Sequence, residues 1–157
     1  MKSRKRHKKK VSFFSFFSHS VMLLIGCAAG IYVLPILTAP QTPTNKEFKI
    51  ATNNAEYEAF FVKDLKGSNF LYWGKGELYL SKNMIAFHGK IAPGADYKMY
   101  LTKRFIQTGN EFLKIKDQSF LVDDVKSFDG FIIKTNKDLD LASYNSVVIW
   151  SEIFSIF

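Results

Sequence analysis

Few side chains in this sequence could carry out nucleophilic, redox or metal chemistry. The 157 residues include one cysteine, Cys27, and three histidines. Cys27 lies in a long apolar run, and His88 is the only histidine after residue 46. Residues 47–157 therefore cannot form a disulfide framework, a thiolate nucleophile, an iron–sulfur cluster or a cysteine-type zinc site.

His88 is expected to be a strand residue with a half-exposed ring, facing away from Ile85 and Phe87. A Ser-His-acid triad lacks support, because no Gly-x-Ser-x-Gly elbow accompanies it. The acidic residues at 123–124 and at 138 and 140 lack the order of a calcium-binding loop, so no metal site is predicted. These residues do not predict an enzyme. The cofactor is not identified, but His88, Met84 and Met99 are the first ligands to consider for one.

The formal charge of +8 is concentrated at the N-terminus. Residues 1–10 hold seven of the 22 Lys and Arg residues. Residues 46–157 hold the other 15 together with all 14 acidic residues, a net charge of +1. Because nucleic-acid binding depends on neutralising many phosphates, this balance argues against a nucleic-acid partner.

Residues 11–37 are predicted to form a transmembrane signal-anchor helix. The 22 residues from 13 to 34 contain no Asp, Glu, Lys or Arg. A helix of that length spans roughly 33 Å, enough to cross a hydrocarbon core of about 30 Å. The basic residues on one flank predict a cytoplasmic tail at 1–10. A single-pass topology follows, in which a Pro/Thr-rich linker at 38–46 leads to an extracytoplasmic domain at 47–157, in the periplasm or at the cell surface.

Two variants of this topology stay open. A cleavable signal peptide could be cut near Cys27, since Ala28 and Ala29 are small. A lipoprotein is the other, because residues 24–27 read Leu-Ile-Gly-Cys, in the form of a lipobox with Cys27 as the lipidation candidate. Apolar residues continue after Cys27, and Pro40 disfavours cleavage after Ala39. The uncleaved anchor is therefore preferred.

Residues 47–157 predict an all-β antiparallel sandwich. Alternation places Ile85 and Phe87 on one face of segment 84–91, and Tyr97, Met99 and Leu101 on one face of segment 97–102. Further strand-like runs occupy 120–125, 130–135 and 146–157. Residues 147–150 are apolar at successive positions, which predicts a strand buried on both faces. Segment 53–65 could be a short helix or an edge strand, and we expect the helix.

The second half of the chain, about residues 70–157, resembles the DM-thirteen domain, also called the electron-transfer DM domain, a family related to DOMON domains. The resemblance lies in a glycine-led strand pair, a turn before a strand that contains Tyr-Leu, a short Val-Lys segment and a terminal Tyr-x-Ser-Val-Val-Ile-Trp motif. The matching residues are Gly76, Leu78, Pro93, Gly94, Asp96, Tyr97, Tyr100, Leu101, Val125, Lys126, Gly130, Tyr144, Ser146, Val147, Val148, Ile149, Trp150 and Phe154.

The resemblance implies a β-sandwich that takes part in electron transfer, here as a membrane-anchored bacterial member. Asp96, Tyr97, Trp150 and Ser151 are the candidate motif positions. In the family a cysteine follows the tryptophan, whereas this chain has Ser151. Because serine has no accessible redox couple and binds soft metals poorly, thiol chemistry does not carry over. Two functions stay open: an accessory in redox or electron transfer, and a non-enzymatic envelope module that binds a ligand or a protein.

Overall fold

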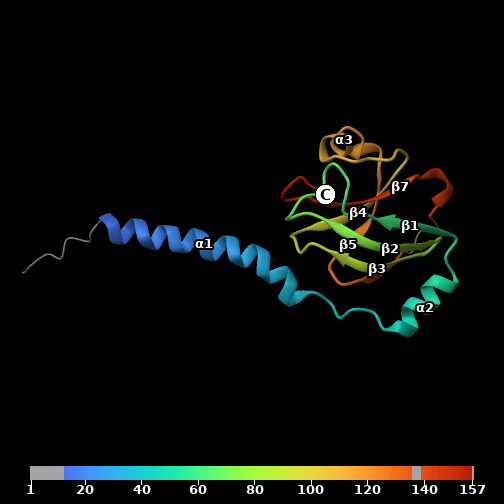
Figure 1. The fold of residues 1–157 in the computed structure, drawn as a ribbon, viewed down its shortest axis with the longest axis horizontal. Coiled ribbons are helices and arrows are strands. Elements are labelled where there is room, and N and C mark those ends of the chain that lie inside the picture. The colour runs from blue at the N-terminus through green and yellow to red at the C-terminus, as the bar shows by residue number, and fades with distance from the viewer. Residues whose placement is uncertain (1–12, 136–138, 157) are drawn as a thin grey trace, which may run out of the picture.

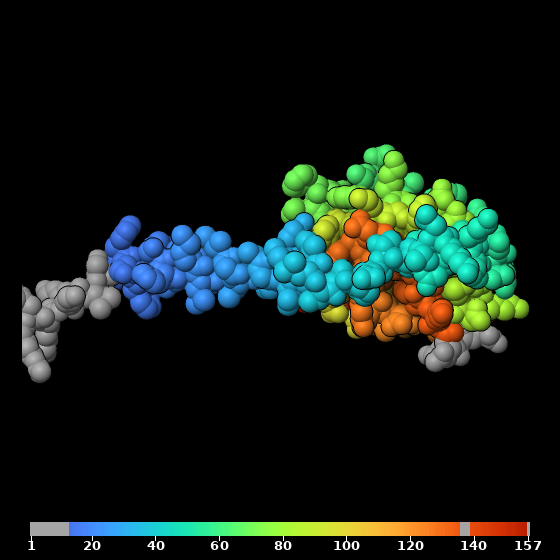
Figure 2. All heavy atoms as spheres, turned by 90° about the horizontal axis from the view of Figure 1, so that it is seen from below, coloured from blue at the N-terminus to red at the C-terminus, as the bar shows by residue number. Residues whose placement is uncertain are grey.

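The computed structural model describes residues 13–135 and 139–156. Helix α1 (Phe13–Thr38) extends away from a β-rich domain in two perpendicular views (Figures 1 and 2). It is long and apolar enough to cross a membrane, although a signal sequence near the N-terminus would pass the same test. The apolar helix is thus a candidate for membrane association, as an anchor or as a signal sequence.

The domain is a sandwich of two antiparallel sheets, as the sequence predicts. The first sheet has the strand order β1-β2-β3-β6 and contains β1 (Tyr57–Phe61), β2 (Gly74–Ser81), β3 (Met84–Ile91) and β6 (Phe131–Lys134). The second has the order β5-β4-β7 and contains β4 (Tyr97–Thr102), β5 (Phe120–Val125) and β7 (Ser146–Ser151). These orders put β1 and β7 at sheet edges.

The main core lies between the two sheets. Ile85 and Phe87 of β3 pack in one buried cluster with Met99 and Leu101 of β4. This confirms the faces that the alternating pattern predicts, because residues two apart on a strand share a face. Rings stack through the core: the centroids of Phe87 and Phe131 are 5.1 Å apart.

The expected helix at 53–65 is wrong, and the edge-strand alternative is correct. Strand β1 pairs with β2, with Tyr57 opposite Leu80. Pairing with a neighbouring strand has overridden the local helical preference. A helix does form earlier in the chain, as α2 (Asn45–Asn53). Its start carries a capping box, in which Thr44 Oγ1 accepts from the Glu47 amide and the Glu47 carboxylate accepts from the Thr44 amide.

Strand β7 is apolar on both faces, but only Val148 and Trp150 on its outer face are buried among its apolar residues, while Val147 and Ile149 are half-buried. Its core-side residues Val147 and Ile149 pack against the main cluster. Its other face is covered by α3 (Gly109–Leu113), whose Phe112 lies against Trp150 with ring centroids 4.9 Å apart. The 3-10 turns η1 (Lys116–Gln118) and η2 (Leu141–Ser143) complete the domain. Trp150 therefore belongs to a second core outside the sandwich.

Candidate functional site

A cleft of about 280 Å³ opens between the edge strands β1 and β7. Two loops border it, residues 62–73 after β1 and residues 103–108 after β4. The lining is mostly apolar and aromatic, and its larger side chains are Phe60, Phe61, Leu65, Tyr72, Trp73, Ile91, Tyr97, Phe105, Val147 and Ile149. A concave, mainly apolar site with few polar groups is the usual form of a small-molecule site.

Backbone hydrogen bonds fix the two loops that border the cleft. The Gly67 amide donates to the Gln107 carbonyl at 2.7 Å, which joins the loops to each other. The Ala92 amide donates to the Trp73 carbonyl at 2.8 Å, which ties the first loop to the end of β3. The shape of the cleft is thus set by the main chain and does not depend on side-chain packing alone.

Hydroxyl groups line the aromatic wall of the cleft, and a lysine lies over the ring of Trp73, although no charged residue is among the described lining. Lys63 Nζ lies 3.8 Å from the ring centroid of Trp73, a cation–π contact. Ser68 and Tyr72 add hydroxyl groups to the lining. This arrangement suits a neutral ligand with flat rings, which can stack on aromatic faces and accept a hydrogen bond from a hydroxyl group.

Tyr97 is the one candidate motif residue that lines the cleft. Its ring is buried and meets Phe128 edge-on with centroids 6.2 Å apart. Burial raises the pKa of its hydroxyl to about 12, so this group is a neutral donor at physiological pH. Gly94 makes room for it, because a Cβ at that position would lie 2.4 Å from Tyr97 Oη.

Ser151 and Asp96 hold the turn before β4 against the C-terminal turn. Ser151 Oγ is fully buried, donates to the Ala95 carbonyl at 2.8 Å and accepts from the Phe154 amide at 3.3 Å. The Asp96 carbonyl accepts from the Glu152 amide at 3.1 Å. Asp96 is exposed and has a φ of 53°, a left-handed conformation that Asp tolerates better than most residues. Both roles are structural.

Trp150 lies on the opposite face of β7 from Ser151, in a closed cluster. Its Nε1 is buried and has no hydrogen-bond partner among the described residues. Beside it Tyr100 Oη donates to Glu152 Oε1 at 2.5 Å, and Lys116 Nζ donates to Glu152 Oε2. Burial alone would raise the pKa of Glu152, but the hydrogen bonds from Lys116 and Tyr100 outweigh it and lower that pKa. Burial, and then the bond to Glu152, raises the pKa of Tyr100.

The three cofactor-ligand candidates are not brought together. His88 is exposed on the outer face of β3, where its ring lies 5.2 Å from that of Phe48. Met84 is half-buried on the same face, beneath α2. Met99 is fully buried between the sheets. None of the three lines the cleft, so they do not form a common ligand set.

No metal centre is formed by the described residues. Within 13–135 and 139–156, no group of three His, Cys, Asp or Glu side chains is placed to hold a metal ion. Asp123 and Asp124 are neighbours on β5, while Asp138 lies outside the described residues. Cys27 is exposed on α1, remote in sequence from the domain. The cleft lining contains aromatic rings and hydroxyl groups, and no His, Cys, Asp or Glu is among its described residues.

Sequence reasoning named Tyr97 as a candidate position but missed most of the other cleft residues. Trp73 and Phe105 lie in loops, and Val147 and Ile149 are named only as strand residues of the family motif. One signal was present: residues 70–73 read Phe-Leu-Tyr-Trp without strand alternation and next to turn-forming residues. An aromatic run in a loop is a better indicator of a binding site than one in a strand.

Comparison with protein-family models identifies the family of this domain. A family model described as Electron transfer DM13 matches residues 60–157, more than half of the chain. The chain belongs to this family, as the sequence resemblance predicts. No curated protein and no solved structure matches it.

Proposed function

We propose that this protein is a membrane-anchored, extracytoplasmic binding module that acts as an accessory in electron transfer and holds a small apolar ligand in its cleft. The observation that carries the proposal is the aromatic cleft between β1 and β7. Membership of the electron transfer DM13 family supplies the redox context.

The anchoring part of the proposal rests on charge and length. Helix α1 has 26 residues without a charged side chain, and the basic residues 2–10 precede it. Positive residues on one flank keep that side of a span in the cytoplasm. The domain after α1 is then held on the other side, with α1 as an uncleaved anchor.

Electron transfer by this domain would require a bound redox group, because its own side chains include no thiol. Cys27 is the only cysteine and lies in α1, so the domain has no thiol couple. Ser151 occupies the position of the family's cysteine and serves as a hydrogen-bonding residue between Ala95 and Phe154. A redox-active ring compound would supply the electron-accepting chemistry, and Trp73, Tyr97 and Phe61 are the residues that would hold it.

The test of ligand binding uses menadione, a small two-ring quinone, and the full chain in detergent. Menadione quenches tryptophan emission at close range, and Trp73 lines the cleft. We expect saturable quenching that is lost in Ala59→Phe, which fills the cleft from β1. The matched control is Ala142→Phe, at an exposed alanine outside the cleft. Equal, non-saturating quenching in both variants would reject the binding site.

The topology is tested separately by adding protease to intact spheroplasts. We expect the domain to be digested while a tag at Ser3 stays protected. Loss of the tag with survival of the domain would reverse the orientation. Labelled palmitate incorporation that disappears in Cys27→Ala would replace the uncleaved anchor by the lipoprotein variant.

A further inference from the structure

The loop at 62–73 exposes an apolar tip beside the cleft. Phe70 and Leu71 are 92% and 55% exposed. Asn69 Oδ1 accepts from the amides of Leu71 and Tyr72, at 2.8 and 3.1 Å, and so fixes the tip in a turn. The next two residues, Tyr72 and Trp73, turn inward and line the cleft. The apolar tip and the aromatic wall are thus consecutive parts of one ordered loop.

This end of the domain is also where α1 arrives. In two perpendicular views the β1–β2 loop lies at the end of the sandwich that faces α1 (Figures 1 and 2). Ala39, just after α1, packs against the main core. Tyr32 of α1 and Tyr72 of the loop both lie near enough to Tyr97 to add to the rise in its pKa, after burial itself. The last turns of α1 and one end of the cleft are therefore neighbours.

From this juxtaposition we propose that the 62–73 loop rests in the surface of the membrane that α1 spans, and that the cleft takes its ligand from the bilayer. The ligand class is a neutral, lipid-soluble molecule with a ring headgroup. The inference rests on the proposed membrane anchor and ligand-binding cleft. It adds the route of the ligand and the source from which it is drawn.

The chemistry of the loop fits the boundary between lipid and water. Tyr and Trp are enriched at this boundary, because one part of each ring system is apolar and the other can hydrogen-bond. Lys63, over the Trp73 ring, can keep its apolar stem along the aromatic surface and its ammonium at the level of the lipid phosphates. Phe70 and Leu71 would enter the acyl region beneath.

The test measures the depth of Trp73 in a bilayer. The full chain is reconstituted in nanodiscs of phosphatidylcholine whose acyl chains are brominated near the headgroup, which quenches nearby indoles. The chain has two tryptophans, so Trp150→Phe reports on Trp73, and Trp73→Phe reports on the buried Trp150. We expect strong quenching of Trp73 and little of Trp150. Equal emission in brominated and unbrominated discs for Trp73 would overturn the proposal.

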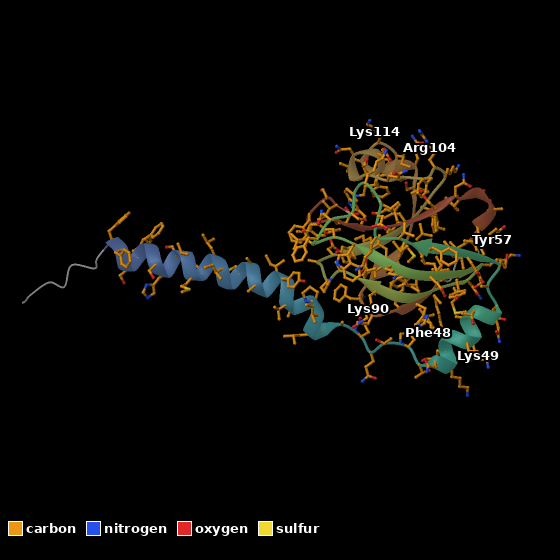
Figure 3. The ribbon with its side chains drawn as sticks, in the orientation of Figure 1. Phe48, Lys49, Tyr57, Lys90, Arg104 and Lys114 are labelled. Carbon is orange, nitrogen blue, oxygen red and sulfur yellow. The ribbon has the colours of Figure 1, made fainter. Side chains whose placement is uncertain are left out.

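The matched pair of variants keeps the test independent of the tryptophan changes. Phe70→Ser with Leu71→Ser should remove most of the bromine quenching in the otherwise natural chain. Ile50→Ser with Tyr57→Ser also removes two exposed apolar side chains, but from α2 and β1, and Tyr57 lies at the end of the domain far from α1 (Figure 3). This control should keep the quenching. Equal loss in both variants, or no loss in either, would contradict the proposal.

Ligand uptake separates this inference from the function on which it rests. Menadione preloaded into the discs should reach the cleft faster in the natural chain than in the Phe70/Leu71 variant, with the same final extent of binding. If binding occurs but neither its rate nor the bromine quenching depends on the tip, the cleft stands and the membrane route fails. If Trp73 is quenched by bromine in a manner that depends on the tip but no saturable binding is found, the proposed function fails and membrane docking alone stands.

Discussion

Strand β7 separates two aromatic clusters that differ in what closes them. On its core side, the cleft with Trp73, Tyr97 and Phe105 is open between two sheet edges. On its other side, the cluster of Tyr100, Phe112 and Trp150 is covered by α3 and bordered by the Lys116–Glu152 ion pair. Trp73 is half-buried, whereas Trp150 is 1% exposed.

This difference shows why aromatic content alone does not identify a site. In the Trp150 cluster the rings of Tyr100, Phe112 and Trp150 pack against one another and are buried, so this cluster stabilises the domain. The cleft leaves aromatic surface accessible because the edges of β1 and β7 are held apart by ordered loops. The four predictions below test this assignment, beginning with the largest expected effect.

Replacing Trp150 by alanine should cost about 3–5 kcal/mol of unfolding free energy, because a large buried side chain leaves a cavity beside Phe112. Trp73→Ala should cost less, since its ring is only half-buried, but should abolish menadione binding. Chemical denaturation of the full chain and the menadione titration measure the two effects. Equal stability losses would erase the distinction between the clusters.

Replacing Ser151 by alanine should cost about 1–3 kcal/mol, because it strips a partner from the buried Ala95 carbonyl and the Phe154 amide. Ser151→Cys should stay within about 1 kcal/mol of the natural chain, since cysteine has a similar shape. The cysteine variant should gain a thiol-dependent redox signal that the natural domain lacks. Thermal unfolding and voltammetry provide the measurements. Ser151→Cys is measured in a Cys27→Ala chain, where its thiol is the only one, and the absence of a thiol-dependent signal there would contradict this expectation.

The acid dependence of stability should include a contribution from the Glu152 cluster. The pKa of Glu152 is lowered in the folded state from its ordinary value of 4.5. Its contribution is therefore present above the unfolded pKa and lost as the pH falls through the folded pKa. Glu152→Gln should flatten the loss of stability below about pH 4.5, while menadione binding at neutral pH should not change. The measurement is chemical denaturation at several pH values. If Glu152→Gln loses stability at low pH as steeply as the natural chain, Glu152 does not contribute to the acid dependence.

The smallest effect is expected at Asp96. Its φ of 53° favours glycine, but glycine also raises the entropy of the unfolded chain. We expect Asp96→Gly to change stability by less than about 1 kcal/mol, because these terms oppose each other. Menadione binding should be unchanged, since the exposed Asp96 does not line the cleft. Weaker binding would make its carboxylate part of the site.

Part of this fold could be predicted because neighbouring residues carry the signal. Alternation in β3 and β4 placed Ile85, Phe87, Met99 and Leu101 in the core. Segment 57–61 forms the edge strand β1 where the sequence predicts a helix, because its pairing partner, β2, begins a dozen residues later and leaves no local mark. Helix α2 does carry a local mark, the Thr44–Glu47 capping box.

The candidate motif residues were predictable from the sequence, but the contacts of their side chains were not. Asp96, Tyr97, Trp150 and Ser151 are close in space, with Tyr97 opposite Ser151 in the β4–β7 pairing. Their side chains nevertheless reach four environments: solvent for Asp96, the cleft for Tyr97, the outer cluster for Trp150, and a buried junction between two turns for Ser151. A motif fixes which residues are neighbours along the chain, but the strand face and its covering element decide what each side chain contacts.

By itself the sequence determined the apolar helix, the class of the domain, its family and the absence of a domain thiol, because each depends on composition or on local periodicity. The tertiary structure decided where the empty space lies. A cleft exists between β1 and β7 because two sheet edges and two loops distant in sequence meet without filling the volume between them. Such a volume is a property of packing across the whole chain, and no run of residues encodes it locally.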